Sequence, residues 1–256
     1  MGTVSKALGL LDVLSQSGAP LGLTEIARLA DFDKATTRRL LLELASNGFV
    51  EQDFDSRAYA LGPALQMLGR VREDRFPLFR TAQPFVRMLA EKTGETAHAA
   101  EYCAGALVSV CIELSAKTIR VNLDEGQKLP LHATASGIAF LAASPPAMFE
   151  SVVKRPLVKL TSQTPGSREE LGLAVSETRM RGYSVSSQTM EEGVHSVGAA
   201  ILNLNGKPVG TVAVALPVAR ATQSLTAEYG LRTRQSAEEI SQKLFGRRAA
   251  HWRKAS

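Results

Sequence analysis

The sequence predicts an α+β protein made of a helical N-terminal domain and a C-terminal domain built on an antiparallel sheet. Its length of 256 residues exceeds the usual domain size of about 150 residues, so two domains are expected. Leucines at helical spacing predominate over residues 5–47, whereas short alternating segments bounded by turns predominate after residue 96. Strands joined by tight turns, with helices outside them, indicate the α+β class.

Three helices are expected in the N-terminal part of the chain. Leucines spaced three to four residues apart predict the first helix over 5–17. Thr24 is the expected N-cap of a short second helix. Asp33 is the expected N-cap of a third helix over 34–47.

A hairpin is expected next, because segments 49–52 and 57–61 alternate around a polar turn. Three helices followed by a hairpin within residues 1–62 are the order of a winged helix-turn-helix domain. In such a domain one helix braces against the DNA backbone and the next presents its N-terminal residues to the major groove. The first 62 residues therefore predict binding to double-stranded DNA.

The candidate DNA contacts are polar and basic side chains on the second and third helices and on the hairpin. They are Thr24, Lys34, Thr36, Arg38, Arg39, Arg57 and Tyr59. Arg and Lys pair with guanine edges or phosphates, and Thr contacts a phosphate or a thymine methyl. Charge alone does not predict this role, since residues 1–62 carry six basic and eight acidic side chains. A solvated helix face, with Tyr59 packed on its own domain, is the alternative interpretation.

A linker helix is predicted over 63–76, and Pro77 interrupts it. Leu65, Leu68 and Val71 lie on one side of this helix and form an apolar stripe. A single chain would have to expose such a stripe, so dimerisation through it is expected.

The remaining chain predicts a sheet with outer helices. Strands are expected at 97–103, 107–113, 118–123, 183–187, 194–204 and 208–216, and helices at 78–92, 135–143, 167–182 and 225–245. Pro145 and Pro146 are expected to stop the helix over 135–143. The pair Asn205-Gly206 favours a tight turn between the last two strands.

Three stretches of the chain carry a resemblance to a known family. They are LTEIARLADFDKATTRRLLLELASNGFVEQD (23–53), which leads into RAYALG (57–62), then GQKLPLHATASGIAFLA (126–142), and GYSVSSQTMEEGVHSVGAAILNLNGKPVGTVAVALP (182–217). In this order and spacing they resemble the IclR family of bacterial transcription regulators, over residues 5–245.

The resemblance implies how the chain is organised and what it binds. The parts implied are a winged helix-turn-helix domain over 1–62, a linker and dimerisation helix over 63–76, a GAF-like effector-binding domain over 77–246 and a basic tail over 247–256. Such proteins regulate metabolic or catabolic operons, as repressors or activators, in response to small organic molecules. The implied partners are a double-stranded DNA operator, a small-molecule effector and further copies of the chain, as a homodimer or a dimer of dimers.

An effector pocket is implied in the C-terminal domain. Its candidate residues are Leu129, Ala135, Ser136, Gly137, Ser186, Gln188, Val194, Ser196, Ala213 and Ala215. Residues 135–137 begin a helix, whose free amides can hold a carboxylate. An ordinary helix start capped by Ser136 is the alternative interpretation.

The same residues predict the kind of effector. Relatives that bind small polar acids are implied to use an acid, a Cys or Ser, and two hydroxyls, where this chain has Ser186, Ser196, Ala213 and Ala215. Because a buried polar group without a partner costs about 1–3 kcal/mol, two alanines disfavour a tiny polar acid. We expect an effector with a carboxylate at one end and an apolar or aromatic body, with Ser196 as its hydrogen-bonding partner.

Other kinds of site find little support in the sequence. Cys103 and Cys111 supply neither a disulfide framework nor a four-cysteine zinc site, and Cys111 is expected to be buried and inert. His98, Glu101, His132 and His195 lack the i, i+4 spacing of a zinc protease, so structural or surface roles are expected for them. There is no Gly-rich phosphate loop, so no cofactor is expected.

The expected location is the cytoplasm. No apolar run approaches the roughly 20 residues that cross a bilayer, and the N-terminus does not read as a secretory signal, so no membrane partner is expected.

Two other functions remain open beside a ligand-responsive, non-enzymatic regulator. One is an enzyme that converts a small acid in its C-terminal domain, against which the predicted pocket offers no catalytic base. The other is a DNA-binding scaffold without an effector, which a ligand screen by thermal shift would distinguish.

Overall fold

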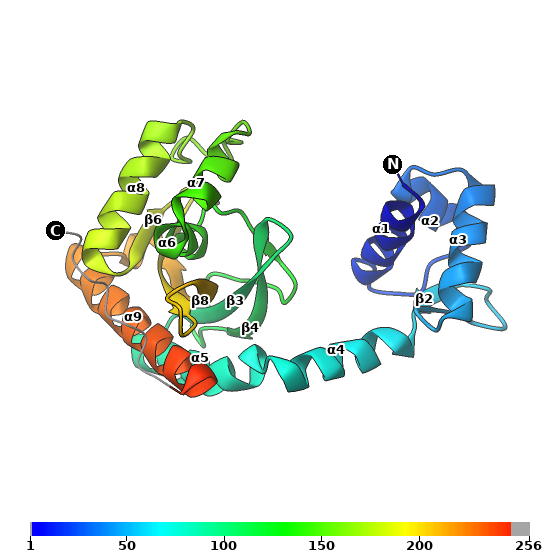
Figure 1. Ribbon diagram of the computed structural model, residues 1–256, viewed down its shortest axis with the longest axis horizontal. Helices are drawn as coiled ribbons and strands as arrows, with labels where there is room; N and C mark the ends of the chain where they lie inside the picture. The colour runs from blue at the N-terminus through cyan, green and yellow to red at the C-terminus, as the bar shows by residue number, and fades with distance from the viewer. Residues whose placement is uncertain (1, 247–256) are drawn as a thin grey trace. The chain divides into compact units, whose positions relative to one another are not determined.

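The structure is a computed structural model that describes residues 2–246, and it falls into two compact units. The first unit ends at Phe76 and the second begins at Pro77. Each unit has its own cluster of buried apolar side chains and is described by itself (Figure 1). The basic tail expected over 247–256 lies outside the described residues.

Three helices and a two-stranded hairpin form the body of the first unit. They are α1 (Thr3–Ser15), α2 (Leu23–Ala30), α3 (Lys34–Ser46), β1 (Val50–Gln52) and β2 (Tyr59–Leu61). Leu10, Ile26 and Leu41 are fully buried, because each lies on the inward stripe of its own helix. The strands pair antiparallel, with Glu51 opposite Ala60. The predicted order of helices and hairpin is therefore confirmed.

The start of α2 differs from the expectation. Gly22, with an extended backbone, is the N-cap, and Thr24 lies inside the first turn of the helix. The prediction of Thr24 as the cap is wrong because Leu21 and Tyr59 exchange two backbone hydrogen bonds, at 2.8 and 3.0 Å. This bridge holds the chain extended up to Gly22, so the helix begins at the next residue.

Helix α4 (Pro63–Arg75) follows the hairpin, with its proline in the first turn, where the missing amide is not needed. No side chain of this helix is buried. Met67, Leu68 and Val71 are 69%, 56% and 50% exposed, whereas Leu65 is half-buried. The helix therefore has an exposed apolar stripe formed by Met67, Leu68 and Val71, whereas the expected stripe contained Leu65 and not Met67.

The second unit is built on a six-stranded antiparallel sheet with the strand order β5-β4-β3-β8-β7-β6. The strands are β3 (Thr96–Cys103), β4 (Ala106–Glu113), β5 (Lys128–Leu129), β6 (Ser184–Ser187), β7 (Val194–Leu202) and β8 (Pro208–Pro217). Chain neighbours β3 and β4 pair through a tight turn, as do β7 and β8. The predicted antiparallel α+β arrangement is confirmed.

Helices cover both faces of this sheet (Figure 1). They are α5 (Leu78–Thr93), α6 (Ala135–Ala143), α7 (Pro146–Val153), α8 (Arg168–Arg181) and α9 (Gln223–Phe245), with a short 3-10 turn at Val218–Arg220. Helices α5 and α9 contact each other and pack on one face. Helix α6 packs on the other face and is covered in turn by α8.

The strand expected at 118–123 is absent, and that prediction is wrong. The segment is irregular because side chains bind its carbonyl groups in place of a neighbouring strand: Thr96 Oγ1 donates to the Val121 carbonyl at 2.7 Å. Pairing with β4 resumes at β5, where Leu129 lies opposite Leu107.

Helix α6 ends at Ala143, shortly before Pro145 and Pro146, as expected. The second of these prolines also begins a new helix. Pro146 begins helix α7, which the sequence analysis did not anticipate. Proline is favoured at a first helical position because its fixed backbone angle suits the helix.

Within residues 2–246, no helix is both long and apolar enough to cross a membrane.

Candidate functional site

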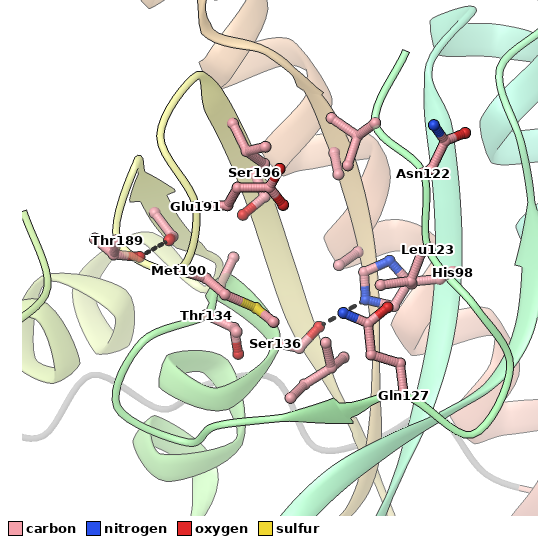
Figure 2. A pocket seen from close by; sticks show the side chains of 17 residues that line it. His98, Asn122, Leu123, Gln127, Thr134, Ser136, Thr189, Met190, Glu191 and Ser196 are labelled. Atoms are coloured by element: carbon pink, nitrogen blue, oxygen red, sulfur yellow. Dashed lines mark hydrogen bonds between the residues drawn. The ribbon is translucent and has the colours of Figure 1, made fainter. Parts of the chain in front are cut away.

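A cavity lies in the second unit where the first turn of α6 meets the sheet. It encloses about 560 Å³ of space between the protein atoms, and this figure includes space open to solvent. Strands β3, β5, β6, β7 and β8 line it together with two irregular segments, 121–127 and 189–191. Figure 2 shows Ser136 and His98 side by side, with Glu191 and Asn122 well away from Ser136.

The first turn of α6 forms one end of the cavity. Thr134 is the N-cap, since its Oγ1 accepts the Gly137 amide at 2.9 Å, so the cap is not Ser136. The amides of Ala135 and Ser136 are in the first turn, where a helix offers them no acceptor of its own. Gly198 on β7 permits this close approach, because a Cβ there would lie 2.9 Å from the carbonyl carbon of Ala135.

His98 on β3 adds a buried imidazole to the same end. Its Nε2 lies 3.2 Å from Ser136 Oγ, and its Nδ1 is buried without a hydrogen-bond partner in the described part of the chain. Burial lowers the pKa of His98 to about 4, so the ring is neutral at pH 7. A neutral imidazole that donates from Nε2 leaves the Ser136 hydroxyl proton free for a ligand.

Segment 121–127 covers another side of the cavity. Val121, Asn122, Leu123 and Gln127 all line it. The segment that was expected to be a strand thus supplies part of the lining, and its irregular backbone lets neighbouring side chains turn inward.

Segment 189–191 brings Thr189, Met190 and Glu191 to the cavity. Thr189 Oγ1 donates to the Ala133 carbonyl at 2.6 Å. The hydroxyls of Ser186 and Thr189 also bond to each other, and Ser186 is then the donor (Figure 2). These bonds fix the segment against the chain that leads into α6.

Eight of the ten predicted effector residues line this cavity. They are Leu129, Ala135, Ser136, Ser186, Val194, Ser196, Ala213 and Ala215. They come together because residues two apart on one strand share a face of the sheet, and that face points toward α6.

Gly137 and Gln188 do not line the cavity. Gly137 packs on the backbone of Leu131, where a Cβ would lie 2.4 Å from the Leu131 Cα. Gln188 has a left-handed backbone, and its Oε1 accepts the Gly193 amide at 3.0 Å. Both residues shape the surroundings of the cavity, which corrects their place in the predicted pocket.

Nine further lining residues escaped the sequence analysis. They are His98, Val121, Asn122, Leu123, Gln127, Thr134, Thr189, Met190 and Glu191. His98 could have been found, since it stands in a predicted strand between two small apolar residues, Ala97 and Ala99. The residues of the two irregular segments have no such signal, because no periodicity relates them to the sheet.

The predicted DNA-reading helix is α3. Asp33 caps it, with Oδ1 accepting the Thr36 amide at 2.8 Å, and this hydrogen bond lowers the pKa of Asp33. Lys34, Arg38 and Arg39 are exposed on this helix, which leaves their cationic groups accessible.

The two candidate DNA contacts on the hairpin differ in their exposure to solvent. Arg57 is exposed, in a left-handed turn conformation. Tyr59 is only 4% exposed and packs in the apolar core of its unit. The predicted phosphate contact through Tyr59 is therefore wrong, because the ring is needed between the hairpin and the helices.

Metal and thiol chemistry receive no support from the described residues. Within 2–246, no three His, Cys, Asp or Glu side chains are grouped so that they could hold a metal ion. Cys111 is buried, and burial raises the pKa of its thiol to about 11, which disfavours the reactive thiolate.

Comparison with known proteins identifies the family. Residues 3–53 match the model of the IclR helix-turn-helix domain, and residues 73–242 match that of the bacterial transcriptional regulator IclR C-terminal domain. The transcriptional repressor IclR of Escherichia coli K12 is 28% identical over 242 residues, covering 93% of this chain and 88% of that protein.

Solved structures agree with the sequence matches. A crystal structure described as an IclR transcriptional regulator from Silicibacter sp. TM1040 is 33% identical, with a TM-score of 0.83 over 95% of this chain and 96% of that one. An IclR homolog from Microbacterium hydrocarbonoxydans, crystallised with 4-hydroxybenzoate, has a TM-score of 0.79 over 95% of this chain and 99% of that one. At 19% identity, that second likeness shows the shared fold alone. The chain belongs to the IclR family of bacterial transcriptional regulators.

Proposed function

We propose that this regulator reads an operator through α3 and is controlled by a small organic acid held in the cavity of its second unit. The observation that carries the proposal is the polar end of that cavity, where the α6 amides, Ser136 and His98 converge. The site of action is the cytoplasm, where the DNA of a bacterium lies.

The acid end of the effector binds at the first turn of α6. The amides of Ala135 and Ser136 and the positive end of the helix dipole favour an anion there. The Ser136 hydroxyl, oriented by His98, donates a further hydrogen bond. A neutral His98 contributes no positive charge, so the helix start carries most of the recognition.

The body of the effector lies against apolar side chains. Leu129, Val194, Ala213 and Ala215 provide them from the strands, and Leu123 adds to them from the irregular segment. Ser196 lies among them as a hydrogen-bonding partner. This wall suits an aromatic or branched aliphatic body better than a two- or three-carbon acid.

Glu191 limits what the far end of the effector can be. It lines the cavity well away from Ser136, so a second carboxylate at that end would meet a like charge (Figure 2). A hydroxyl or other donor would instead hydrogen bond to Glu191. The preferred effector is thus a monocarboxylate with an apolar or aromatic body and a neutral or donor group at its other end.

DNA binding rests on the exposed cations of α3. In this proposal Lys34, Arg38 and Arg39 contact base edges or phosphates, and Thr36 contacts the DNA beside them. Thr24 on α2 and Arg57 on the hairpin contact phosphates. A dimer would set two such helices at the spacing of two operator half-sites. The exposed stripe of Met67, Leu68 and Val71 on α4 supports a homodimer, alone or as half of a tetramer.

A calorimetric panel tests the effector proposal. The panel holds benzoate, 4-hydroxybenzoate, a branched aliphatic acid, glyoxylate and pyruvate. We expect an aromatic or branched acid to bind most tightly and to change the affinity for a duplex that the protein has selected from a random library. Tightest binding of glyoxylate or pyruvate would refute the argument from the apolar wall. Absence of any measurable binding across the panel would favour a scaffold without an effector.

A further inference from the structure

A buried carboxylate lies in the short connection between α5 and β3. Glu95 is 2% exposed, and its two oxygens accept hydrogen bonds from Arg220 Nε and Nη2 at 2.8 and 2.6 Å. Lys117 Nζ donates to the same carboxylate at 2.8 Å. Burial alone would raise the pKa of Glu95, but the hydrogen bonds and charges of Arg220 and Lys117 outweigh it and lower the pKa. The carboxylate is therefore ionised and bridges two cations.

The residues that follow α5 also hold segment 115–121, which leads to the lining of the cavity. Ser115 Oγ donates to the Gly94 carbonyl at 2.8 Å, directly after α5. Thr96 Oγ1 donates to the Val121 carbonyl at 2.7 Å, and Val121 lines the cavity. Arg220, while bound to Glu95, also donates to a carbonyl of this segment, at 3.1 Å. Segment 115–121 is thus attached to residues 94–96, which follow α5 in the chain, and to Arg220, which Glu95 binds.

We propose that Glu95 is a positioning residue that couples occupation of the cavity to α5, by holding segment 115–121 against the end of that helix. The inference rests on the proposed function and adds the route by which the effector acts. A ligand that contacts Val121 and Leu123 shifts the segment that Glu95 holds. In the chain, α5 follows α4 directly and so continues from the DNA-binding unit.

Coupling of this kind is reciprocal. If the ligand changes operator affinity by shifting the segment, operator binding must change ligand affinity by the same free energy, and it does so by shifting the same segment. Segment 115–121 is therefore expected to respond to DNA in the absence of any ligand. This allows a test that does not require the effector to be known.

The test is hydrogen–deuterium exchange on the full chain, with Glu95→Gln as the variant. The glutamine keeps the shape of the side chain but removes the charge that holds Lys117 and Arg220. We expect the amides of segment 115–121 to exchange roughly tenfold faster in the free variant than in the parent. Glu113→Gln is the matched control, since Glu113 joins β4 to Arg87 of α5 at 3.7 Å without contacting this segment.

The second arm adds the selected operator duplex. In the parent and in Glu113→Gln, DNA is expected to change hydrogen exchange over residues 115–121. In Glu95→Gln this response is lost although the duplex still binds. Glu95→Asp is expected to restore part of the response. A purely structural role would alter the free protein but keep the response to DNA. An unchanged segment in the free variant, or an equal DNA response in parent and Glu95→Gln, would overturn the proposal. Failure to bind any duplex would instead refute the DNA-binding function, and exchange in the free variants still decides whether Glu95 holds the segment.

Discussion

Enlarging Ala213 should separate ligand binding from DNA binding. Ala213 is 1% exposed and lies on β8 between His98 of β3 and Gly198 of β7 in the register of the sheet. Its Cβ faces the cavity, so the three extra carbons of Ala213→Leu occupy space that a ligand would use. Because this space is filled only when the ligand is bound, the complex and not the free protein is overpacked. Overpacking of about 1–3 kcal/mol confined to the complex corresponds to roughly 5- to 150-fold weaker ligand binding.

The assay combines calorimetry with fluorescence anisotropy. Calorimetry measures the affinity for the acid that binds the parent most tightly, and anisotropy measures the affinity for the selected duplex without ligand. We expect the ligand affinity of Ala213→Leu to fall by the factor above. Its affinity for the duplex should stay within about twofold, because Ala213 belongs to the second unit and α3 to the first.

Ala199→Leu is the matched control for Ala213→Leu. Ala199 is also buried and lies opposite Val212, on the face of the sheet turned away from the cavity. Its larger side chain enters packed space, so it should lower the melting temperature, but it should leave ligand affinity unchanged. If Ala213→Leu binds the ligand as tightly as the parent, the effector lies elsewhere and the assignment of this cavity is wrong.

Three more predictions follow from the structure. Arg38→Ala or Arg39→Ala should weaken operator binding by about 1–3 kcal/mol where the arginine reads a base, and binding should fall steeply with salt; unchanged gel-shift affinity in both variants would exclude α3 as the reading helix. Leu68→Glu should shift the sedimentation of the chain toward a monomer, and a parent protein that is already monomeric at micromolar concentration would contradict the dimer. Because the folded pKa of His98 is about 4, below its ordinary 6.5, the unfolded state takes up the proton first, so the free energy of unfolding should fall by about 3 kcal/mol as pH drops from about 6.5 to 4. Urea unfolding of His98→Asn should lack this part of the pH dependence, and an identical pH profile in both proteins would refute the burial of a neutral ring.

The sequence by itself determined the fold class, the order of most elements and about half of the cavity wall. Leu40 and Leu41 belong to a run of leucines at helical spacing, which predicted that α3 buries them. The resemblance to the IclR family, and not periodicity, assigned Ala213 and Ala215 to the pocket. The start of α6 was also predictable, because a short polar stretch before a small-residue helix marks free amides at the helix start.

Only the tertiary structure decided which residues complete the site. Segment 115–127 follows no periodicity, since its carbonyls bind side chains such as those of Thr96 and Arg220, which are distant in the chain. The buried places of His98 and Tyr59 likewise depend on what packs over them. A residue pattern encodes local conformation, whereas burial and ion pairing, as at Glu95, depend on contacts between distant segments that form only when the chain has folded.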